Sequence, residues 1–408
     1  MEHRKKILFI HHGKGLGGAP LSLLYLIQQL PSALYQPVVA FLHDSDALAL
    51  FKKNNIPVLG PLGWQDFPHT KIWHFKWYHC HHLFRAAMHT LVSFFFIAPR
   101  LYRQEKPALV HLNTSSLVAW GAAAWFMNIP VVWHIREPLA DGYIGLRKAF
   151  IRWCVGTFAT SIVAISHHDG QPWITSKKLS IIYNAVPVDR FDYTINPSDF
   201  RSAHQLSNAS CILFVGGTSQ EKGTLPLLKA FEKVLTNIPS AKLLIAGYMP
   251  TDAPRKYKLR SPSSHYAAEV TMTIKKHANN IILLGPIEHV PTAMAAADVV
   301  VFPATVGHFA RPIIEAGFMK KPVIASRLAP LDELVINDVT GLLVATADTK
   351  AWAHALITLL SSQEKRTIMG QAGYSYCSEK FSLPHQSNQI AQLYAHILKG
   401  DHHEPLGP

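Results

Sequence analysis

Cysteine is scarce in this sequence, and its four copies have no spacing that suits a metal or a redox pair. Neither a Cys-x-x-Cys pair nor a regular cysteine framework occurs, which excludes zinc ribbons and disulfide-rich secreted folds. The cysteines stand alone, at Cys80, Cys154, Cys211 and Cys377. We therefore expect reduced thiols in the core of a cytoplasmic protein.

Long apolar runs are also lacking. Only the apolar residues 7–10 follow the basic start of the chain before His11 and His12, too few for the core of a signal peptide. The later run of residues 91–98 is far shorter than the roughly 18 to 20 residues that cross a bilayer as a helix. The sequence therefore predicts a cytoplasmic protein that is soluble or peripheral on the inner face of the membrane.

Acidic residues are few: 26 Asp and Glu stand against 39 Lys and Arg, which gives a formal net charge of +13. Such an excess suits an anionic partner, such as nucleotide phosphates or anionic lipid. No nucleic-acid-binding motif occurs, so nucleic acid is not an expected partner. Hydrophobic residues make up 49% of the 408 residues, which is enough for two packed cores.

Short β-branched apolar runs alternate with helical stretches twice along the chain. In the first half the predicted strands are 7–11, 37–42, 109–112, 131–135, 162–165 and 180–183. In the second half they are 211–215, 242–246, 281–284, 298–302 and 322–325. Continuously apolar strands are typical of a parallel sheet that is covered on both faces. We therefore predict an α/β fold of two doubly wound, Rossmann-like domains, 1–187 and 188–408, the second ending in three closing C-terminal helices.

The first predicted strand runs into a glycine-rich turn with G-x-G-x-x-G spacing, residues 13–18, and then into a helix. Glycines let the backbone approach a phosphate, and a helix N-terminus supplies N–H groups and partial positive charge. A flexible turn without a ligand is the alternative. A dinucleotide site is a further one, with Asp44 at the ribose, although Pro20 and the double glycine fit that fingerprint imperfectly.

Two charged residues of the second half follow predicted strands. Lys222 comes after a strand and the pair Gly216-Gly217, where an ammonium group would neutralise a diphosphate leaving group; a solvated loop lysine is the alternative. Glu315 lies in an apolar run at a predicted helix start. A carboxylate is costly there unless it is bound, and sugar or ribose hydroxyls would bind it. The alternative is a carboxylate that caps its own helix.

These segments, in this order and spacing, resemble the retaining glycosyltransferases of family 4. The similarity covers nearly the whole chain and is strongest over residues 212–344, and residues 182–189 resemble the family's Ile-x-Asn-Gly-Val-Asp hinge. The resemblance implies a GT-B fold, in which two Rossmann-like domains face each other across an interdomain cleft. It also implies hexosyl transfer from a nucleotide-diphosphate sugar to a glycan or lipid-linked glycan, as in polysaccharide biosynthesis. Retention, without a protein nucleophile, a metal or a required cofactor, is part of the same implication.

The resemblance assigns roles to matching positions. Gly17 and Gly18 approach the donor phosphates, His134 lies beside the transferred sugar, Lys222 meets the diphosphate, and Glu315 holds the ribose as the second glutamate of the Glu-x7-Glu motif. The candidate catalytic residues are His134, Lys222 and Arg311. The candidate donor-binding residues are Gly17, Gly18, Gly216, Lys222, Ile313 and Glu315. Asn113, Arg136 and Glu137 are further candidates, either on the acceptor side or with a role that stays open.

Three positions depart from the family pattern. Gly307 replaces the first glutamate of Glu-x7-Glu, Gly217 replaces an arginine, and Ile135 replaces the aspartate after the family histidine. Arg136 and Arg311 lie near these gaps and would replace the lost positive charge. The departures leave a non-catalytic nucleotide- or sugar-binding relative as an alternative. A nicotinamide-dependent oxidoreductase is the other alternative, although it leaves Lys222 and Glu315 unexplained.

Residues 67–104, within a predicted insertion over 64–104, contain no Asp or Glu but five Lys or Arg, six His and ten aromatic residues. This composition is typical of an interfacial helix on an anionic membrane. A helical insertion packed on the first domain is the alternative. The cluster His79-Cys80-His81-His82 lacks the second, spaced pair of ligands that a metal site needs.

Overall fold

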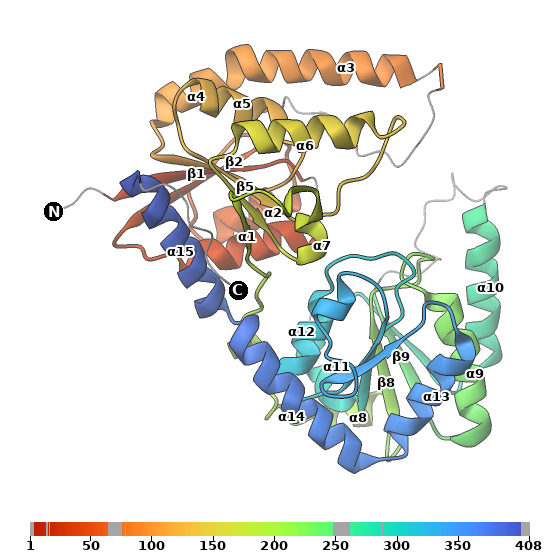
Figure 1. Cartoon of the computed structure of the whole chain (residues 1–408). Coiled ribbons are helices and arrows are strands. Elements are labelled where there is room, and N and C mark those ends of the chain that lie inside the picture. The colour runs from red at the N-terminus through yellow and green to blue at the C-terminus, as the bar shows by residue number, and fades with distance from the viewer. Residues whose placement is uncertain are drawn as a thin grey trace. The chain divides into compact units, whose positions relative to one another are not determined.

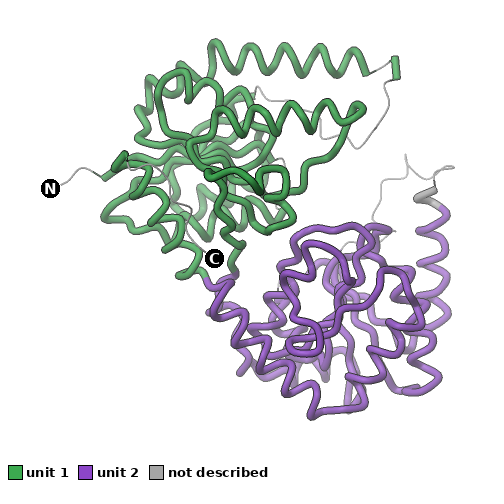
Figure 2. Tube along the Cα trace, viewed as in Figure 1, with its two compact units in different colours: residues 1–185, 383–408 green, residues 186–382 purple. Residues whose placement is uncertain are grey.

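The computed structural model describes residues 4–13, 15, 17–63, 76–77, 79–247, 262–287 and 289–400, the side chains of 262–264 excepted. The chain divides into two compact units, which Figure 2 shows. Unit 1 comprises Met1–Ala185 with Leu383–Pro408, and unit 2 comprises Val186–Ser382. The tail from residue 401 on lies outside the described residues, and so do residues 64–75 and Tyr78 of the basic aromatic segment.

Unit 1 is built on a parallel sheet (Figure 1). Its described strands have the order β3-β2-β1-β4-β5-β6-β7. The strands are β1 (Lys5–His11), β2 (Tyr35–Phe41), β3 (Val58–Leu59), β4 (Leu109–Leu112), β5 (Val131–Ile135), β6 (Ser161–Ala164) and β7 (Leu179–Ile181). This is the doubly wound order, in which the winding direction reverses between β1 and β4. Ligands of such sheets bind at the carboxyl ends of the strands beside this switch point.

Helices cover both faces of this sheet and create two hydrophobic cores. The described helices are α1 (Gly18–Gln29), α2 (Asp46–Lys53), α3 (His79–Val92), the π-helix η1 (Ser93–Ile97), α4 (Ala98–Glu105), α5 (Val118–Phe126), α6 (Leu146–Phe158), α7 (His167–Gly170), the 3₁₀ helix η2 (Gln171–Trp173) and α15 (Leu383–Lys399). One core lies under α4, α5 and α6. The other lies under α1, α2 and α15.

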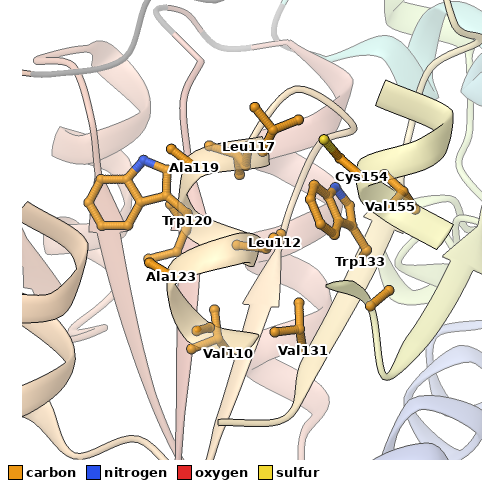
Figure 3. Packing of buried hydrophobic residues seen from close by; sticks show 14 of the residues in the cluster. Val110, Leu112, Leu117, Ala119, Trp120, Ala123, Val131, Trp133, Cys154 and Val155 are labelled. Carbon is orange, nitrogen blue, oxygen red and sulfur yellow. The ribbon is translucent and has the colours of Figure 1, made fainter. Parts of the chain in front are cut away.

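The first of these cores is packed around two tryptophans, Trp120 of α5 and Trp133 of β5 (Figure 3). Helix α5 is rich in alanine and glycine, which lets it come close to the sheet. A Cβ atom at Gly121 would lie 2.4 Å from the indole ring of Trp133, so this position has room only for glycine. The indole N–H of Trp133 donates to the carbonyl of Thr114 at 2.9 Å and so ties the loop after β4 to β5.

The last helix corrects the domain prediction, because α15 belongs to unit 1 and not to the second domain. It packs on α1, and its buried residues Ile390, Leu393 and Tyr394 join the core beneath α1 and α2. The Gln386 side chain donates to the carbonyl of Tyr183 at 2.7 Å. Periodicity predicted the helix itself, but the spacing of apolar residues does not say which core an amphipathic face will cover.

Unit 2 holds a second parallel sheet, with the described order β10-β9-β8-β11-β12-β13. Its strands are β8 (Cys211–Val215), β9 (Lys242–Ala246), β10 (Ile281–Gly285), β11 (Val299–Phe302), β12 (Val323–Ser326) and β13 (Gly341–Val344). Its described helices are η3 (Val188–Arg190), α8 (Ser198–Ala203), α9 (Thr224–Asn237), α10 (Pro262–Lys276), α11 (Val290–Ala296), α12 (Arg311–Phe318), η6 (Leu331–Glu333), α13 (Thr349–Leu360) and α14 (Gln363–Lys380). The switch point lies between β8 and β11. The two predicted Rossmann-like sheets are thus confirmed.

Every predicted strand is present within about two residues of its predicted bounds, whereas β3 and β13 were not predicted as strands. β3 is only Val58–Leu59, and β13 begins with a glycine, so neither has the pattern of a long β-branched run. In the part of the chain that the structure describes, no helix is both long and apolar enough to cross a membrane.

Candidate functional site

A cluster of buried polar side chains lies at the carboxyl ends of β1, β4 and β5 in unit 1. His11 ends β1, His111 lies in β4, Asn113 follows β4, His134 lies in β5, and Arg136 follows β5. These strands flank the switch point, which explains why residues far apart in the sequence meet here. The cluster contains three predicted site residues, Asn113, His134 and Arg136. His11 and His111 were not predicted.

Arg136 is the centre of this cluster. Its Nε donates to Oδ1 of Asn113 at 2.5 Å, its Nη1 donates to Oδ1 of Asn184 at 2.6 Å, and its Nη2 lies 3.4 Å from Nδ1 of His134. Burial lowers the pKa of Arg136 to about 9, against the opposing effect of the Glu137 carboxylate. The guanidinium is therefore still charged at neutral pH.

The three histidines around Arg136 are uncharged at neutral pH. Burial, aided by the charge of Arg136, holds the pKa of His134 and of His111 well below the usual range. Burial, with contributions from His12 and Arg136, lowers the pKa of His11 to about 3. These rings therefore act as hydrogen-bonding groups and not as cations.

Glu137 holds together the loops that follow β4 and β5. One oxygen, Oε1, accepts from the hydroxyl of Thr114 at 2.5 Å, the hydroxyl of Ser115 at 2.8 Å and the backbone N–H of Ser115 at 3.1 Å. Glu137 was a candidate for the acceptor side, with its role left open. Its contacts show that it also fixes the backbone beside Asn113 and Arg136.

The glycine-rich turn is open at one end and tightly packed at the other. Gly17 is the N-cap of α1, and added Cβ atoms at Gly17 and Gly18 would meet nothing within 4 Å. At Gly13, in contrast, a Cβ atom would lie 2.7 Å from Nε2 of His11. The turn thus covers the His11 ring and leaves space around the first residues of α1. Lys14 and Leu16 lie outside the described residues.

In unit 2, Lys222 and His308 meet across the switch point. Lys222 lies in the loop after β8, and its Nζ is 2.6 Å from Nε2 of His308, in the loop after β11. Nδ1 of His308 lies 2.9 Å from the carbonyl of Val306, so Nδ1–H donates there and Nε2 accepts from the ammonium. Burial lowers the pKa of Lys222, against the opposing effect of Glu221. His308 was not predicted, because no sequence spacing links it to Lys222, although both residues follow strands beside the switch point.

Gly216 and Gly217 take part in the packing of strand ends in unit 2. The backbone N–H groups of Gly216 and Gly217 both donate to the carbonyl of Ala246, at 3.0 and 2.9 Å. They are therefore used within the fold and not left for a phosphate. Gly247 has a φ of +120°, and a Cβ atom there would lie 2.5 Å from the nitrogen of Gly217. The glycines thus serve the close approach of the ends of β8 and β9.

Glu315 does not cap its helix, which excludes the alternative reading of this residue. It lies in the second turn of α12, whose N-cap is Ala310. It is only 6% exposed, and its Oε1 lies 3.1 Å from Nη2 of Arg311. Burial raises the pKa of Glu315, and the charge of Arg311 opposes this rise. Two predicted residues, Arg311 and Glu315, are thus brought together. Ile313, which lies between them in the sequence, is buried, and its N–H donates to the carbonyl of Ala310.

The departure at Gly307 has a steric cause in this structure. A Cβ atom at Gly307 would lie 2.0 Å from the carbonyl oxygen of Ala329. No side chain fits there unless the backbone moves, so the first glutamate of the motif has no room. Among the described residues, no three His, Cys, Asp or Glu side chains are grouped as ligands for a metal ion.

Residues 198–376 match the family model described as glycosyl transferases group 1, and residues 16–190 match that described as Glycosyltransferase Family 4. The chain belongs to glycosyltransferase family 4. The nicotinamide alternative loses its support, since both units match glycosyltransferase models. This family 4 protein is 24% identical over 318 residues to the Staphylococcus aureus capsular polysaccharide biosynthesis glycosyltransferase CapM, which covers 73% of this chain and 79% of CapM.

A second relative is the Escherichia coli UDP-Gal:alpha-D-GlcNAc-diphosphoundecaprenol alpha-1,3-galactosyltransferase. It is 23% identical over 326 residues, which cover 76% of this chain and 80% of the relative. Among solved structures, Anabaena Alr3699/HepE in complex with UDP superposes with a TM-score of 0.79 at 21% identity, over 96% of this chain and 99% of HepE. The two units therefore have the GT-B fold.

Proposed function

We propose that this glycosyltransferase moves a hexosyl group from a uridine diphosphate sugar to a lipid-linked glycan, with retention at the anomeric carbon. HepE, which shares the fold, is described in complex with UDP and with UDP-glucose. The E. coli relative is named for a UDP-Gal donor and a diphosphoundecaprenol acceptor. Both similarities support a donor with a diphosphate and an acceptor on a polyprenyl lipid.

The observation that carries the donor proposal is the environment of Lys222. Its ammonium group is partly buried at the end of β8, and its hydrogen-bond partner is the neutral ring of His308. Within the described residues Lys222 forms no ion pair with a carboxylate. A buried cation with a neutral partner favours an anionic ligand, because such a ligand restores the charge pairing that burial makes valuable.

The remaining donor contacts follow from the charges of unit 2. Glu315, held by Arg311, offers carboxylate oxygens to the two ribose hydroxyls. Lys222 stabilises the diphosphate as its negative charge grows. In unit 1, His134 contributes a hydrogen bond to the transferred sugar, and the open N-terminus of α1 at Gly17 and Gly18 faces phosphate oxygens.

In the proposed reaction the bond between the anomeric carbon and the leaving phosphate oxygen breaks, and a bond to the acceptor oxygen forms on the same face of the sugar. The acceptor hydroxyl gives its proton to the leaving phosphate. No protein nucleophile takes part. The protein contributes positioning of the reactants and stabilisation of the leaving charge.

The acceptor proposal rests on an aromatic surface of unit 1. Large exposed apolar side chains gather on α3, η1, the end of α5 and α6, namely Phe84, Met88, Leu91, Phe95, Phe96, Trp125, Phe126, Phe150 and Trp153. Ring contacts connect these helices: Phe94 lies 5.6 Å from Phe126, and Phe158 lies 5.5 Å from Trp125 and 5.6 Å from Trp153. Exposed apolar patches of this kind are typical of interaction sites.

The charge of the same helices favours an anionic membrane as the partner. Residues 79–97 and 146–158 contain four Lys or Arg and no Asp or Glu, and three of these basic residues, Arg85, Lys148 and Arg152, are exposed. Arginine and lysine beside exposed aromatic rings are the signature of a helix that lies in the interface of an anionic bilayer. A surface of this kind would bring the enzyme to a lipid-linked acceptor. It includes α5 and α6, which lie outside the predicted segment 67–104.

The experiment is a donor panel in which UDP release is measured with UDP-glucose, UDP-galactose and UDP-N-acetylglucosamine, with and without polyprenyl-diphosphate glycans in anionic vesicles. We expect one donor to give acceptor-dependent release, and Lys222→Ala to lower that release about a hundredfold. Lys229→Ala is the control, because Lys229 is exposed and paired with Glu269 at 2.9 Å. The steric exclusion of the motif glutamate at Gly307 favours a second candidate, a nucleotide-sugar-binding protein without turnover. Tight binding of a donor with no release under any condition would establish that candidate and overturn the enzyme proposal.

A further inference from the structure

The tautomer of His134 follows from its neighbour Arg136. Nη2 of Arg136 lies 3.4 Å from Nδ1 of His134, and a guanidinium group can only donate. Nδ1 of His134 is therefore an acceptor. A neutral imidazole with an acceptor at Nδ1 carries its proton on Nε2. That Nε2 is buried and has no hydrogen-bond partner among the described residues, so an N–H donor stands ready for an oxygen atom.

Hydrogen bonds connect His134 with the last helix through His111. Nε2 of His111 lies 3.1 Å from Nδ1 of His134. Since Nδ1 of His134 accepts, Nε2 of His111 donates, and Nδ1 of His111 is left as an acceptor. The hydroxyl of Tyr394, on α15, lies 2.7 Å from this Nδ1 and donates to it. Burial raises the pKa of Tyr394 well above the usual range, so the phenol keeps its proton.

His11 is set in a parallel way. Nε of Arg136 donates to Oδ1 of Asn113, and the amide nitrogen of Asn113 then donates to Nδ1 of His11 at 3.0 Å. His11 therefore also carries its proton on Nε2, which has no partner among the described residues and lies beneath Gly13. The Nε2–H groups of His134 and His11 are thus both set by hydrogen bonds that run outward from Arg136. The tautomer of His11 is set by Arg136 alone, through Asn113. The tautomer of His134 is set by Arg136 and, through His111, also by Tyr394.

We infer that Tyr394 is a positioning residue for the sugar-transfer site: through His111 it holds His134 in the tautomer that presents Nε2–H to an oxygen of the donor sugar. The identity of that oxygen rests on the proposed function. Without the Tyr394 hydroxyl, Nδ1 of His111 loses its donor. On the Tyr394 side nothing then favours a proton on Nε2 of His111 over one on Nδ1. The arrangement in which Nδ1 of both His111 and His134 is protonated is therefore opposed by Arg136 alone.

The variant Tyr394→Phe tests this inference, because it removes one hydroxyl and keeps the ring in the core. Helix α15 keeps the Gln386 contact and its buried apolar residues, so we expect the fold to persist. The matched control is Tyr35→Phe. Tyr35 donates to the carbonyl of Ala391 on the same helix at 3.1 Å, and its ring packs edge-on against that of Tyr394 with 5.6 Å between the centroids. It does not take part in the hydrogen bonds that join Tyr394, His111 and His134.

The primary readout is the pair of ring-nitrogen signals of His134 in long-range ¹H–¹⁵N spectra, assigned with His134→Gln. We expect the wild type to show Nε2 protonated, Tyr394→Phe to shift population toward protonated Nδ1, and Tyr35→Phe to match the wild type. With the donor identified by the panel, kcat should fall about tenfold in Tyr394→Phe, with KM for the donor nearly unchanged.

A second variant distinguishes an effect through the Tyr394–His111–His134 hydrogen bonds from an effect on the packing of α15. His111→Asn removes the imidazole that joins Tyr394 to His134. In that background we expect Tyr394→Phe to add no further loss of kcat. Unchanged His134 signals in Tyr394→Phe, or equal losses in Tyr394→Phe and Tyr35→Phe, would overturn the inference. Because the spectra need no turnover, an absence of sugar transfer in the wild type would refute the proposed function and leave this test intact.

Discussion

Replacing Lys222 by methionine should lower turnover about a hundredfold and leave the fold at least as stable as before. Methionine keeps the length and apolar volume of the lysine stem beside Phe302, whose ring centroid lies 5.4 Å from Nζ, and removes only the charge. A contact between an ammonium and a developing phosphate charge contributes about 3 kcal/mol to transition-state stabilisation, and each 1.36 kcal/mol corresponds to a factor of ten.

The expected effect on stability has the opposite sign. Burial lowers the pKa of Lys222 in the folded protein, so the unfolded chain holds this proton more tightly. The charged lysine therefore destabilises the fold at neutral pH, and this penalty shrinks as pH rises through the lowered pKa toward the unfolded value. Methionine removes the penalty. The loss of the donor to Nε2 of His308 is small in comparison, because that ring is partly exposed and water can replace the ammonium.

The assay compares kcat and the thermal midpoint of wild type, Lys222→Met and Lys229→Met at pH 7.5 and pH 9. Lys229→Met, on the exposed face of α9, should keep wild-type turnover. The reasoning would be refuted if Lys222→Met kept more than about a third of wild-type kcat. It would also be refuted if its midpoint at pH 7.5 fell by several degrees, since the lysine would then be part of the fold's support.

Three further outcomes are expected. Glu315→Gln should weaken UDP binding in calorimetry by about tenfold to a hundredfold, because ribose hydroxyls lose a charged acceptor worth about 1.5 to 3 kcal/mol; unchanged affinity would remove the ribose role. Phe96→Ser should reduce co-sedimentation with anionic vesicles, because Phe96 is 70% exposed on the aromatic surface. Ile368→Ser should not, although Ile368 in unit 2 is 60% exposed. Equal losses in both variants would exclude the aromatic surface as the membrane-binding site. Gly121→Ala should lower the thermal midpoint by several degrees, since its Cβ would lie 2.4 Å from the Trp133 ring and overpacking costs about 1 to 3 kcal/mol; an unchanged midpoint would show that the ring can move.

Much of the fold was predictable because continuous β-branched runs mark buried parallel strands. The bounds of 109–112, 131–135, 211–215 and 242–246 were predicted residue for residue. Strands that are very short or begin with glycine, such as β3 and β13, carry too weak a pattern. The assignment of α15 failed for a different reason: an amphipathic helix can cover either core, and only tertiary contacts decide between them.

Members of the candidate site were predictable where a residue follows a strand and carries a charge, as Lys222 and Arg136 do. They were not predictable where the hydrogen-bond partner comes from a distant segment. Tyr394 and His111 are separated by 283 positions in the sequence, and no local pattern marks a tyrosine on the face of a C-terminal helix as a hydrogen-bond donor to a strand histidine. His308 was missed in the same way, since the contact with Lys222 joins two loops that only the strand order brings together.

Unit 1 is made of two pieces of chain with the whole of unit 2 between them, and this imposes an order on biosynthesis. Domains generally fold as they leave the ribosome, so unit 2 is complete while unit 1 still lacks Leu383–Lys399. Until that helix emerges, the nascent chain exposes the apolar surface of α1 that α15 later covers. A message truncated before residue 383 would thus yield a chain with an intact second unit and no Tyr394. Its first unit would expose an apolar surface that favours aggregation. Only a full-length chain completes both the core and the hydrogen bonds that direct His134.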